Sequence, residues 1–179
     1  MIFESTPISG AFVIRPEFTA DDRGAFARTF CTEEFAAMGL DPRVVQCSVS
    51  INTRAGTLRG LHYQADPHGE AKLVRCSRGA IFDVAVDLRT DSPTYLRWFG
   101  VTLDDTNHSG FFIPRGCAHG FQTLVDASEI AYQISTQYSP EAGRGVRWDD
   151  PAFAIEWPEP PSGGRMLSER DARYADYHL

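Results

Sequence analysis

The sequence predicts an all-β protein, built as an antiparallel sandwich, jelly roll or barrel. Strand-like runs recur at short spacing between residues 45 and 138, with almost no helical pattern between them. The 15 glycines and 11 prolines are spread along the chain where turns are expected, which favours many short elements over long helices. Apolar residues make up 42% and charged residues 23% of the 179 residues, a composition typical of a packed domain.

A short helix is predicted before the first strand. Thr32 is expected to cap it, and the acidic residues Glu33 and Glu34 suit its positive N-terminal end. Residues 35–38 fill the helix, and Gly39 ends it.

The strand predictions begin where the hydrophobic period changes to two. Apolar and polar residues alternate there, which predicts a half-buried strand with a polar face: Val45, Cys47, Val49 and Ile51 against Gln46, Ser48, Ser50 and Asn52. Residues 58–64 form the next expected strand, entered through a turn at Ala55 and Gly56.

The runs 71–76 and 80–88 are joined by a three-residue loop that ends in Gly79, which predicts a hairpin. Further strands are expected at residues 95–103, 111–113, 117–124 and 130–138. From Ser139 onward, proline and tryptophan predict an irregular C-terminal wrap, with a short helix around residues 168–174. No repeat or linker divides the chain, so residues 1–179 are expected to form a single domain.

Charge and patterning exclude several classes of function. The 17 lysines and arginines against 24 acidic residues give a net charge of −7, which argues against binding nucleic acid or an anionic membrane through the overall field. This net charge does not exclude a basic pocket that binds a small anion. Neither a targeting segment nor an apolar run of membrane-spanning length is visible, so we expect a cytoplasmic protein.

The four cysteines are Cys31, Cys47, Cys76 and Cys117. They form no C-x-x-C pair, which disfavours a structural zinc site or a redox motif. We expect them to be reduced, small core residues.

Four residues stand out as candidates for chemistry. If residues 58–64 form one strand, His62 shares a face with Gly60, which would leave room for a ligand. His119 also has nearby glycines. Lys72 opens an otherwise apolar strand and must reach water, an acid or an anionic ligand. Tyr132 lies in mid-strand. Taken singly, each is more often a packing or surface residue.

A metal site is the competing hypothesis for two histidines in a small β-barrel. The chain lacks an H-x-H pair, because position 64 is Gln64. Three ligands would require a carboxylate such as Glu70 or Glu129 beside His62 and His119. We therefore expect no metal.

The chain resembles the dTDP-4-dehydrorhamnose 3,5-epimerase family of the cupin superfamily. The matching segments follow one another in the same order as in the family and cover nearly the whole chain. The matching segments are residues 22–26 (DRGAF), 56–64 (GTLRGLHYQ), 72–75 (KLVR), 79–84, 86–89, 92–95, 113–124, 138–140, 148–151, 155–158 and 168–171 (SERD). The resemblance implies a cupin-type jelly roll (double-stranded β-helix), usually a homodimer, that needs no cofactor. It also implies an NDP-4-keto-6-deoxyhexose substrate, inverted at C3, C5 or both.

The resemblance assigns four catalytic roles. His62 is the base that removes a proton made acidic by the C4 ketone, and Asp171 orients it. Lys72 matches the cation that stabilises the C4 oxygen as the enolate forms. Tyr132 matches the acid that returns a proton from the opposite face.

The resemblance also implies a set of substrate-binding residues: Arg23, Phe26, Arg28, Gln46, Arg59, His119 and Tyr138. Arg59 and His119 are expected near the C4 oxygen. Arg23 would pair with the diphosphate, and Phe26 would stack on the base.

Three positions depart from the commonest family pattern. Arg28 and Gly143 stand where acids are usual, and Cys47-Ser48 replaces Asp-Asn. An arginine donates hydrogen bonds where an acid accepts them, so CDP- and GDP-linked sugars join the dTDP-linked ones as candidate substrates. Arg28 could equally point into solvent.

Two further hypotheses stay open at this point. The first is a non-catalytic or regulatory cupin that binds a sugar nucleotide. The second is a metal-dependent cupin oxygenase or isomerase, which the missing H-x-H pair disfavours.

Overall fold

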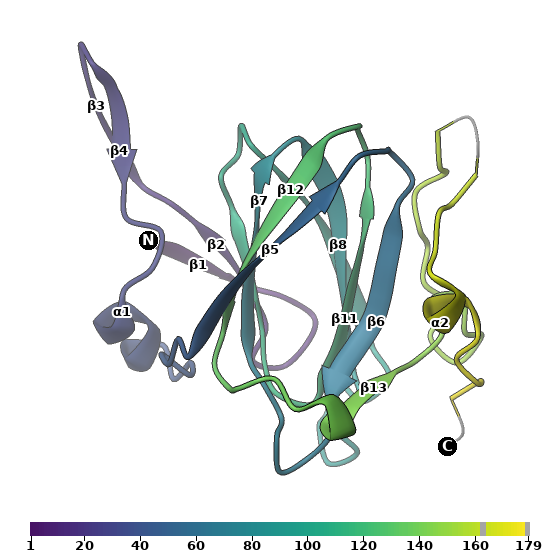
Figure 1. Cartoon of the computed structure of the whole chain (residues 1–179). Helices are drawn as coiled ribbons and strands as arrows, with labels where there is room; N and C mark the ends of the chain where they lie inside the picture. The colour runs from purple at the N-terminus through teal and green to yellow at the C-terminus, as the bar shows by residue number, and fades with distance from the viewer. Residues whose placement is uncertain (162–163, 178–179) are drawn as a thin grey trace.

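Two antiparallel sheets packed face to face form the body of the protein (Figure 1). The computed structural model describes residues 1–161 and 164–177. The six-stranded sheet has the order β1 (Ile2–Ser5), β2 (Phe12–Arg15), β10 (Gly110–Ile113), β7 (Lys72–Arg78), β12 (Ser128–Ile134), β5 (Gln46–Asn52). The five-stranded sheet has the order β13 (Gly143–Gly145), β6 (Leu58–Gln64), β11 (Cys117–Thr123), β8 (Ala80–Asp87), β9 (Trp98–Asp104). The predicted jelly roll is confirmed.

The core lies between the sheets. Its central cluster joins fully buried side chains of both layers, among them Val74, Phe111 and Ile130 from the six-stranded sheet and Ile81 and Phe121 from the five-stranded one. Because hydrophobic burial stabilises by about 25 cal/mol per Å², these large buried side chains dominate the packing of the two layers.

The N-terminal helix α1 spans Thr32–Ala37, close to its predicted bounds. Its N-cap is Cys31 rather than the predicted Thr32, and no side chain in the described part of the chain caps it. The helix is held instead by Phe35, which is 1% exposed and packs edge-on against Phe3 and Phe112. Gly39 follows the helix at a φ of +71°, as the sequence predicted for its end.

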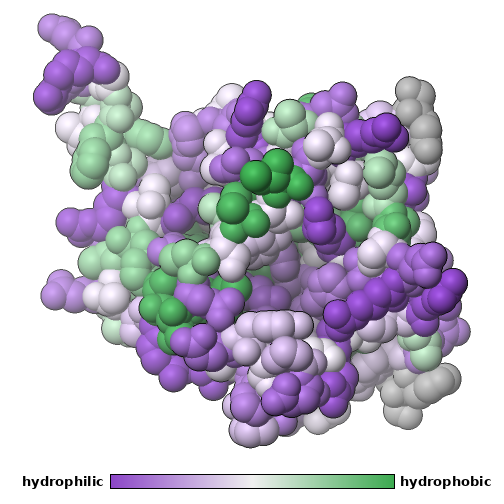
Figure 2. All heavy atoms as spheres, viewed as in Figure 1, coloured by the Kyte–Doolittle hydropathy of each residue, from purple (hydrophilic) through white to green (hydrophobic). Residues whose placement is uncertain are grey.

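In the edge strand β5, apolar side chains face outward and polar side chains face inward, which is the reverse of the usual half-buried strand. Its polar residues Gln46 and Ser50 are half-buried at the wall of a cavity between the sheets, whereas Val49 and Ile51, which border the same cavity, are 57% and 67% exposed. Figure 2 shows strongly hydrophobic atoms on this face, beside a hollow in the surface. The prediction that all four cysteines lie in the core is also wrong, because Cys47 is exposed on this strand, and only Cys76 and Cys117 are buried.

The connection from β7 to β8 is not the predicted hairpin. Strand β7 pairs with β10 and β12, while β8 pairs with β11 and β9 in the other sheet. Gly79, at a φ of +78°, turns the chain from one layer to the other, and Asp105 accepts its backbone N–H at 2.7 Å. The sequence signals of a hairpin loop and of a corner between sheets are the same at this position.

A second, separate hairpin was not predicted. Among the described residues, strands β3 (Phe18–Asp21) and β4 (Gly24–Ala27) pair only with each other, and they project from the body (Figure 1). An isolated two-stranded hairpin is at best marginally stable in water, so this one calls for a packing partner.

The C-terminal segment wraps along the five-stranded sheet, as expected (Figure 1). It contains a 3-10 turn at Pro140–Ala142 and the short helix α2 at Glu169–Ala172. Ser168 caps α2 by accepting the N–H of Asp171 at 3.1 Å. The predicted strands 95–103 and 130–138 are shorter than expected, because β9 starts at Trp98 and β12 ends at Ile134. Within the described residues, no helix is long and apolar enough to cross a membrane.

Candidate active site

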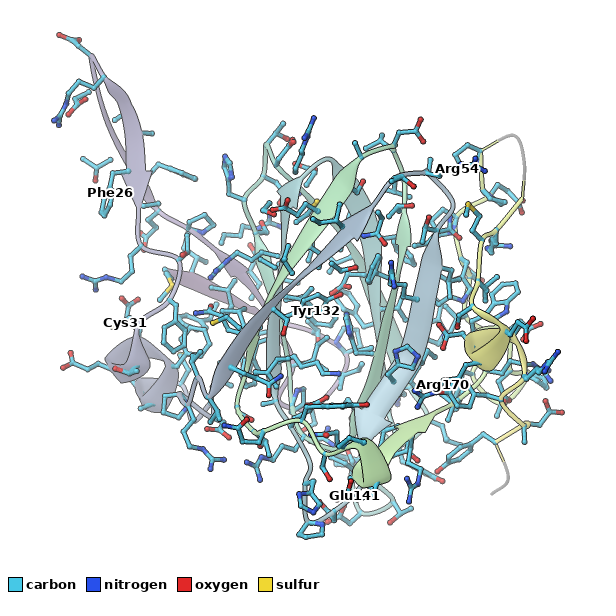
Figure 3. The ribbon with its side chains drawn as sticks, in the orientation of Figure 1. Phe26, Cys31, Arg54, Tyr132, Glu141 and Arg170 are labelled. Carbon is cyan, nitrogen blue, oxygen red and sulfur yellow. The ribbon has the colours of Figure 1, made fainter. Side chains whose placement is uncertain are left out.

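A cavity of about 740 Å³ opens between the two sheets. Its walls come from β5, β6, β7, β11 and β12, and from the segment that carries α2. All four predicted catalytic residues line it: His62, Lys72, Tyr132 and Asp171. Of the predicted binding residues, Gln46, Arg59, His119 and Tyr138 line it as well. Figure 3 shows Tyr132 between the two sheets and Arg170 on α2 at the side of the five-stranded sheet.

His62 and Asp171 form a hydrogen-bonded pair at the cavity wall. His62 Nε2 lies 2.7 Å from Asp171 Oδ1, and the two side chains are 41% and 6% exposed. Burial is the largest single influence and opposes ionisation of Asp171, but the hydrogen bond and charge of His62, together with hydrogen bonds from Gly60 and Ser168, outweigh it and lower the pKa of this carboxyl. A carboxylate that accepts from Nε2–H leaves the lone pair on Nδ1 free to take a proton.

A register shift in β6 places Arg59 beside His62. His119 pairs with His62, but Phe121 pairs with Arg59, so three residues of β6 span the length of two residues of β11. The prediction that Gly60 shares the face of His62 and leaves room for a ligand is therefore wrong. A Cβ on Gly60 would lie 2.5 Å from Gly120 Cα, so the two glycines let the two backbones approach closely.

Lys72 reaches an acid, one of the three destinations predicted for it. Its Nζ lies 2.8 Å from Glu70 Oε1, and both side chains are nearly buried. Glu70 also accepts from Gln64 Nε2 at 3.0 Å. The ion pair fixes the ammonium at the cavity wall without exposing an uncompensated charge.

His119 has an aspartate of its own. Its Nε2 lies 2.8 Å from Oδ1 of Asp83, a residue in the middle of β8 that is 0% exposed. The ring of Tyr132 meets that of His119 edge-on, with centroids 6.0 Å apart. Burial, and then the charge of Asp83, raise the pKa of Tyr132, so the phenol keeps its proton.

The other predicted binding residues lie outside this cavity. Arg23 and Phe26 are on the projecting hairpin, where Phe26 is 78% exposed and Arg23 pairs with Asp21 (Figure 3). Arg28 Nη1 lies 3.0 Å from Glu34 Oε1 at the surface. Within one chain, the structure does not bring these three residues to the catalytic set.

Some residues of the site were missed by the sequence reasoning. Asp83 lies within an expected strand and Arg170 lies within the C-terminal motif, but no sequence pattern assigned either of them a role. Glu70 was weighed only as a metal ligand. Among residues 1–161 and 164–177, no group of three histidine, cysteine or acidic side chains has the geometry of a metal site. Glu129 bonds to Ser77 at the surface.

Comparison with known proteins agrees with this geometry. The family model for dTDP-4-dehydrorhamnose 3,5-epimerase matches residues 5–178. The dTDP-4-dehydrorhamnose 3,5-epimerase of Sinorhizobium fredii is 43% identical over 172 residues, which cover 96% of this chain and 87% of the relative.

Two crystal structures extend the comparison. That of the Elizabethkingia anophelis dTDP-4-dehydrorhamnose 3,5-epimerase superposes with a TM-score of 0.95 at 35% identity, covering 99% of this chain and 96% of that one. The crystal structure of a 3'-monoepimerase from Streptomyces bikiniensis in complex with dTDP-quinovose superposes with a TM-score of 0.84 at 36% identity. The match covers 94% of this chain and 84% of that one. This chain belongs to the dTDP-4-dehydrorhamnose 3,5-epimerase family.

Proposed function

We propose that this protein is an epimerase that inverts C3, C5 or both in a nucleotide-linked 4-keto-6-deoxyhexose. One observation carries the proposal. The base candidate His62 enters the cavity from the five-stranded sheet, and the acid candidate Tyr132 enters it from the six-stranded sheet. A sugar held between the sheets would lose a proton on one side and receive one on the other, which is what inversion of a carbon requires.

The first step is removal of a proton next to the C4 ketone. The ketone makes the hydrogens on C3 and C5 acidic, and an imidazole is a base suited to removing one of them near neutral pH. Asp171 orients His62 and stabilises the imidazolium that forms.

The second requirement is stabilisation of the enolate. Negative charge develops on the C4 oxygen, and Lys72 supplies the cation for it, with Arg59 and His119 beside the same cavity. Arg59 is oriented by the buried Asn52, whose Oδ1 accepts from Nε at 2.8 Å.

The last step is return of a proton from the opposite side. Tyr132 holds its proton firmly because its pKa is raised, and an enolate carbon is basic enough to take it. A proton from solvent then restores the phenol, and His62 releases the proton that it took to solvent, which returns both residues to their starting states.

The location of the residues expected to bind the nucleotide supports a homodimer as the active form. Arg23 and Phe26, which the family resemblance assigns to the diphosphate and base, lie on a hairpin whose strands pair only with each other within the chain. The exposed Val49 and Ile51 on β5 favour contact with a second copy. In this assembly each hairpin closes the cavity of its partner, next to Tyr138, which is 60% exposed at the cavity wall. A cytoplasmic location stays a prediction from the sequence.

A non-catalytic cupin is the alternative from another class. The similarity to catalysts over nearly the whole chain favours the epimerase. The test is NMR in D₂O with a panel of NDP-4-keto-6-deoxysugars, following deuterium at C3 and C5. Incorporation with inversion at either carbon is expected. Binding without any exchange, across the panel, would leave a binding protein and refute the epimerase.

A further inference from the structure

One buried side-chain amide contacts both the ion pair of Lys72 and the segment that carries Tyr138. Gln64 is the last residue of β6 and is 5% exposed. Its Nε2 donates to Glu70 Oε2 at 3.0 Å, and the other carboxylate oxygen of Glu70 lies 2.8 Å from Lys72 Nζ. Its Oε1 accepts the backbone N–H of Ser139, the residue after Tyr138, at 2.6 Å. The two ends of one amide therefore hold both groups.

The partners of Gln64 fix the orientation of its amide. Besides Glu70, Nε2 donates to the backbone carbonyls of His68 at 3.0 Å and Gln137 at 3.2 Å. These three partners only accept, whereas the N–H of Ser139 only donates. A flipped amide would place its oxygen against three acceptors, so the side chain has one orientation. In that orientation it joins two segments that are far apart in the sequence.

The first of these segments controls the position of Lys72. A lysine ammonium lies at the end of a flexible four-carbon chain, so a partner must hold it in one place. That partner is Glu70, which lies outside the strands, between β6 and β7, and whose second oxygen is held by Gln64. An ammonium has three donors, so the contact with Glu70 leaves donors for a substrate oxygen in the cavity that Lys72 lines.

The second segment controls the direction of the Tyr138 ring. Tyr138 lies between β12 and the 3-10 turn, and it is 60% exposed at the cavity wall. Gln46 Oε1 accepts its backbone N–H at 2.9 Å. Gln64 binds the residues on either side of it, through the carbonyl of Gln137 and the N–H of Ser139. Two glutamines, one from each sheet, therefore hold the backbone from which the ring projects.

We propose that Gln64 is a positioning residue for both ends of the substrate. Through Glu70 it places Lys72 at the C4 oxygen, and through residues 137–139 it places Tyr138 beside the nucleotide. The inference rests on the proposed function and deepens it. Gln64 is not among the described residues that line the cavity, so its loss removes no contact with the substrate. It should nevertheless lower both turnover and nucleotide affinity.

The first experiment uses Gln64→Met, which keeps the length of the side chain and removes its hydrogen bonds. We expect kcat to fall about 10²-fold, because a misplacement of about 1 Å can cost this much. The Kd for dTDP, measured by calorimetry, should rise about three- to tenfold, the range for a disturbed aromatic stack. Wild-type kcat and Kd in the folded variant overturn the proposal. A loss of kcat alone overturns the role at the nucleotide, and a loss of affinity alone overturns the role at Lys72.

Gln122→Met is the matched control. Gln122 is also a buried glutamine with partners at both ends of its amide, Pro158 O at 3.0 Å and Arg165 Nε at 2.8 Å. It is not among the described residues that line the cavity. The control variant should lose stability while its kcat and its Kd for dTDP stay near the wild-type values. Equal losses of kcat in the two variants would show a general effect of a buried glutamine and overturn the proposal.

The second experiment separates positioning from a structural role. In a Lys72→Ala background, Gln64→Met should lower kcat by less than about threefold more, because residues that act through one another are not additive. It should still weaken dTDP binding, since the contact with residues 137–139 does not pass through Lys72. A loss of kcat by the same factor in both backgrounds overturns the route through Lys72.

A third variant keeps the proposal testable if substitutions at Gln64 prevent folding. Glu70→Gln removes the charge that holds Lys72 but leaves the contacts of Gln64 with residues 137–139. We expect kcat to fall about 10²-fold with little change in the Kd for dTDP, and a wild-type kcat overturns the route through Glu70. If the wild-type enzyme exchanges no C3 or C5 proton in any ketosugar, the proposed function fails and the role at Lys72 with it. The affinity of Gln64→Met for dTDP then still decides the role at Tyr138.

Discussion

His62 and His119 lie directly opposite each other on β6 and β11, and each binds a different aspartate through Nε2. Asp171 comes from the C-terminal helix α2, whereas Asp83 comes from the middle of β8. One aspartate therefore depends on docking of the C-terminal segment, and the other is part of the sheet. The two histidines are expected to respond differently to substitution, which separates proton removal from charge stabilisation.

His62→Asn should abolish exchange of the C3 and C5 protons while leaving nucleotide binding nearly unchanged. Asparagine retains a side chain of similar polarity but cannot accept a proton, and loss of a general base typically costs about 10²–10⁴ in rate. Deuterium uptake followed by NMR gives the rate, and titration with dTDP gives the binding control. Exchange at the wild-type rate would show that another group is the base.

Tyr132→Phe should separate exchange from inversion. Phenylalanine keeps the ring that packs edge-on against His119 but cannot deliver a proton. His62 should still remove a proton and return deuterium from the same side, so the substrate gains deuterium with retained configuration. The configuration of the deuterated sugar is read from proton coupling constants. Inverted product at an undiminished rate would assign the acid role to a different residue.

The fold was predictable to the level of the jelly roll because strand periodicity and turn residues are local signals. The pairing of β7 was not, because Gly79 looks the same in a hairpin and in a corner between layers. The orientation of β5 was also missed, since its polar face lines a cavity that exists only when both sheets are assembled. His62, Lys72 and Tyr132 could be named from the family motifs. Asp83 could not, because a charged residue becomes significant only when its burial and its partner are known.

Gly60→Ala should destabilise the fold much more than Gly24→Ala. The two glycines have nearly the same backbone φ, +132° and +128°, which side-chain-bearing residues rarely adopt, so both variants carry a conformational penalty of about 1–3 kcal/mol. At Gly60 the new Cβ would lie 2.5 Å from Gly120 Cα, whereas at Gly24 no atom of residues 1–161 and 164–177 would lie within 4 Å of it. We expect a further loss of about 1–3 kcal/mol in the free energy of unfolding, measured by urea titration. Equal losses in the two variants would show that the approach of β6 to β11 relaxes at no cost.

Two inactive variants should restore activity when they are mixed as subunits. His62→Asn lacks the base, and Phe26→Ala lacks the aromatic contact of the hairpin. If each hairpin serves the partner's cavity, a mixed dimer has one complete site, and random reassociation should recover about one quarter of the wild-type activity. No recovery despite demonstrated subunit exchange would place the hairpin in its own protomer, and a monomer on size-exclusion chromatography would refute the shared site altogether.

The last prediction concerns the base of the nucleotide. Arg28 follows the hairpin strand β4, and Gly143 lies beside Tyr138, where a Cβ on the glycine would lie 4.0 Å from the phenol oxygen. Relative to the commoner acids at these positions, the pocket has gained a donor and lost acceptors. Thymine and guanine present a ring N–H that a carboxylate accepts, whereas cytosine presents acceptors at O2 and N3 that arginine can meet.

We therefore expect CDP to compete at least as well as dTDP, and calorimetric titration with dTDP, CDP and GDP measures this. The competing interpretation is that Arg28 stays in the surface pair with Glu34 seen within one chain, where its side chain is 64% exposed. Arg28→Glu distinguishes the two, because it should shift preference toward dTDP only if Arg28 meets the base. A clear preference for dTDP that Arg28→Glu leaves unchanged would remove Arg28 from the pocket and restore thymidine as the base.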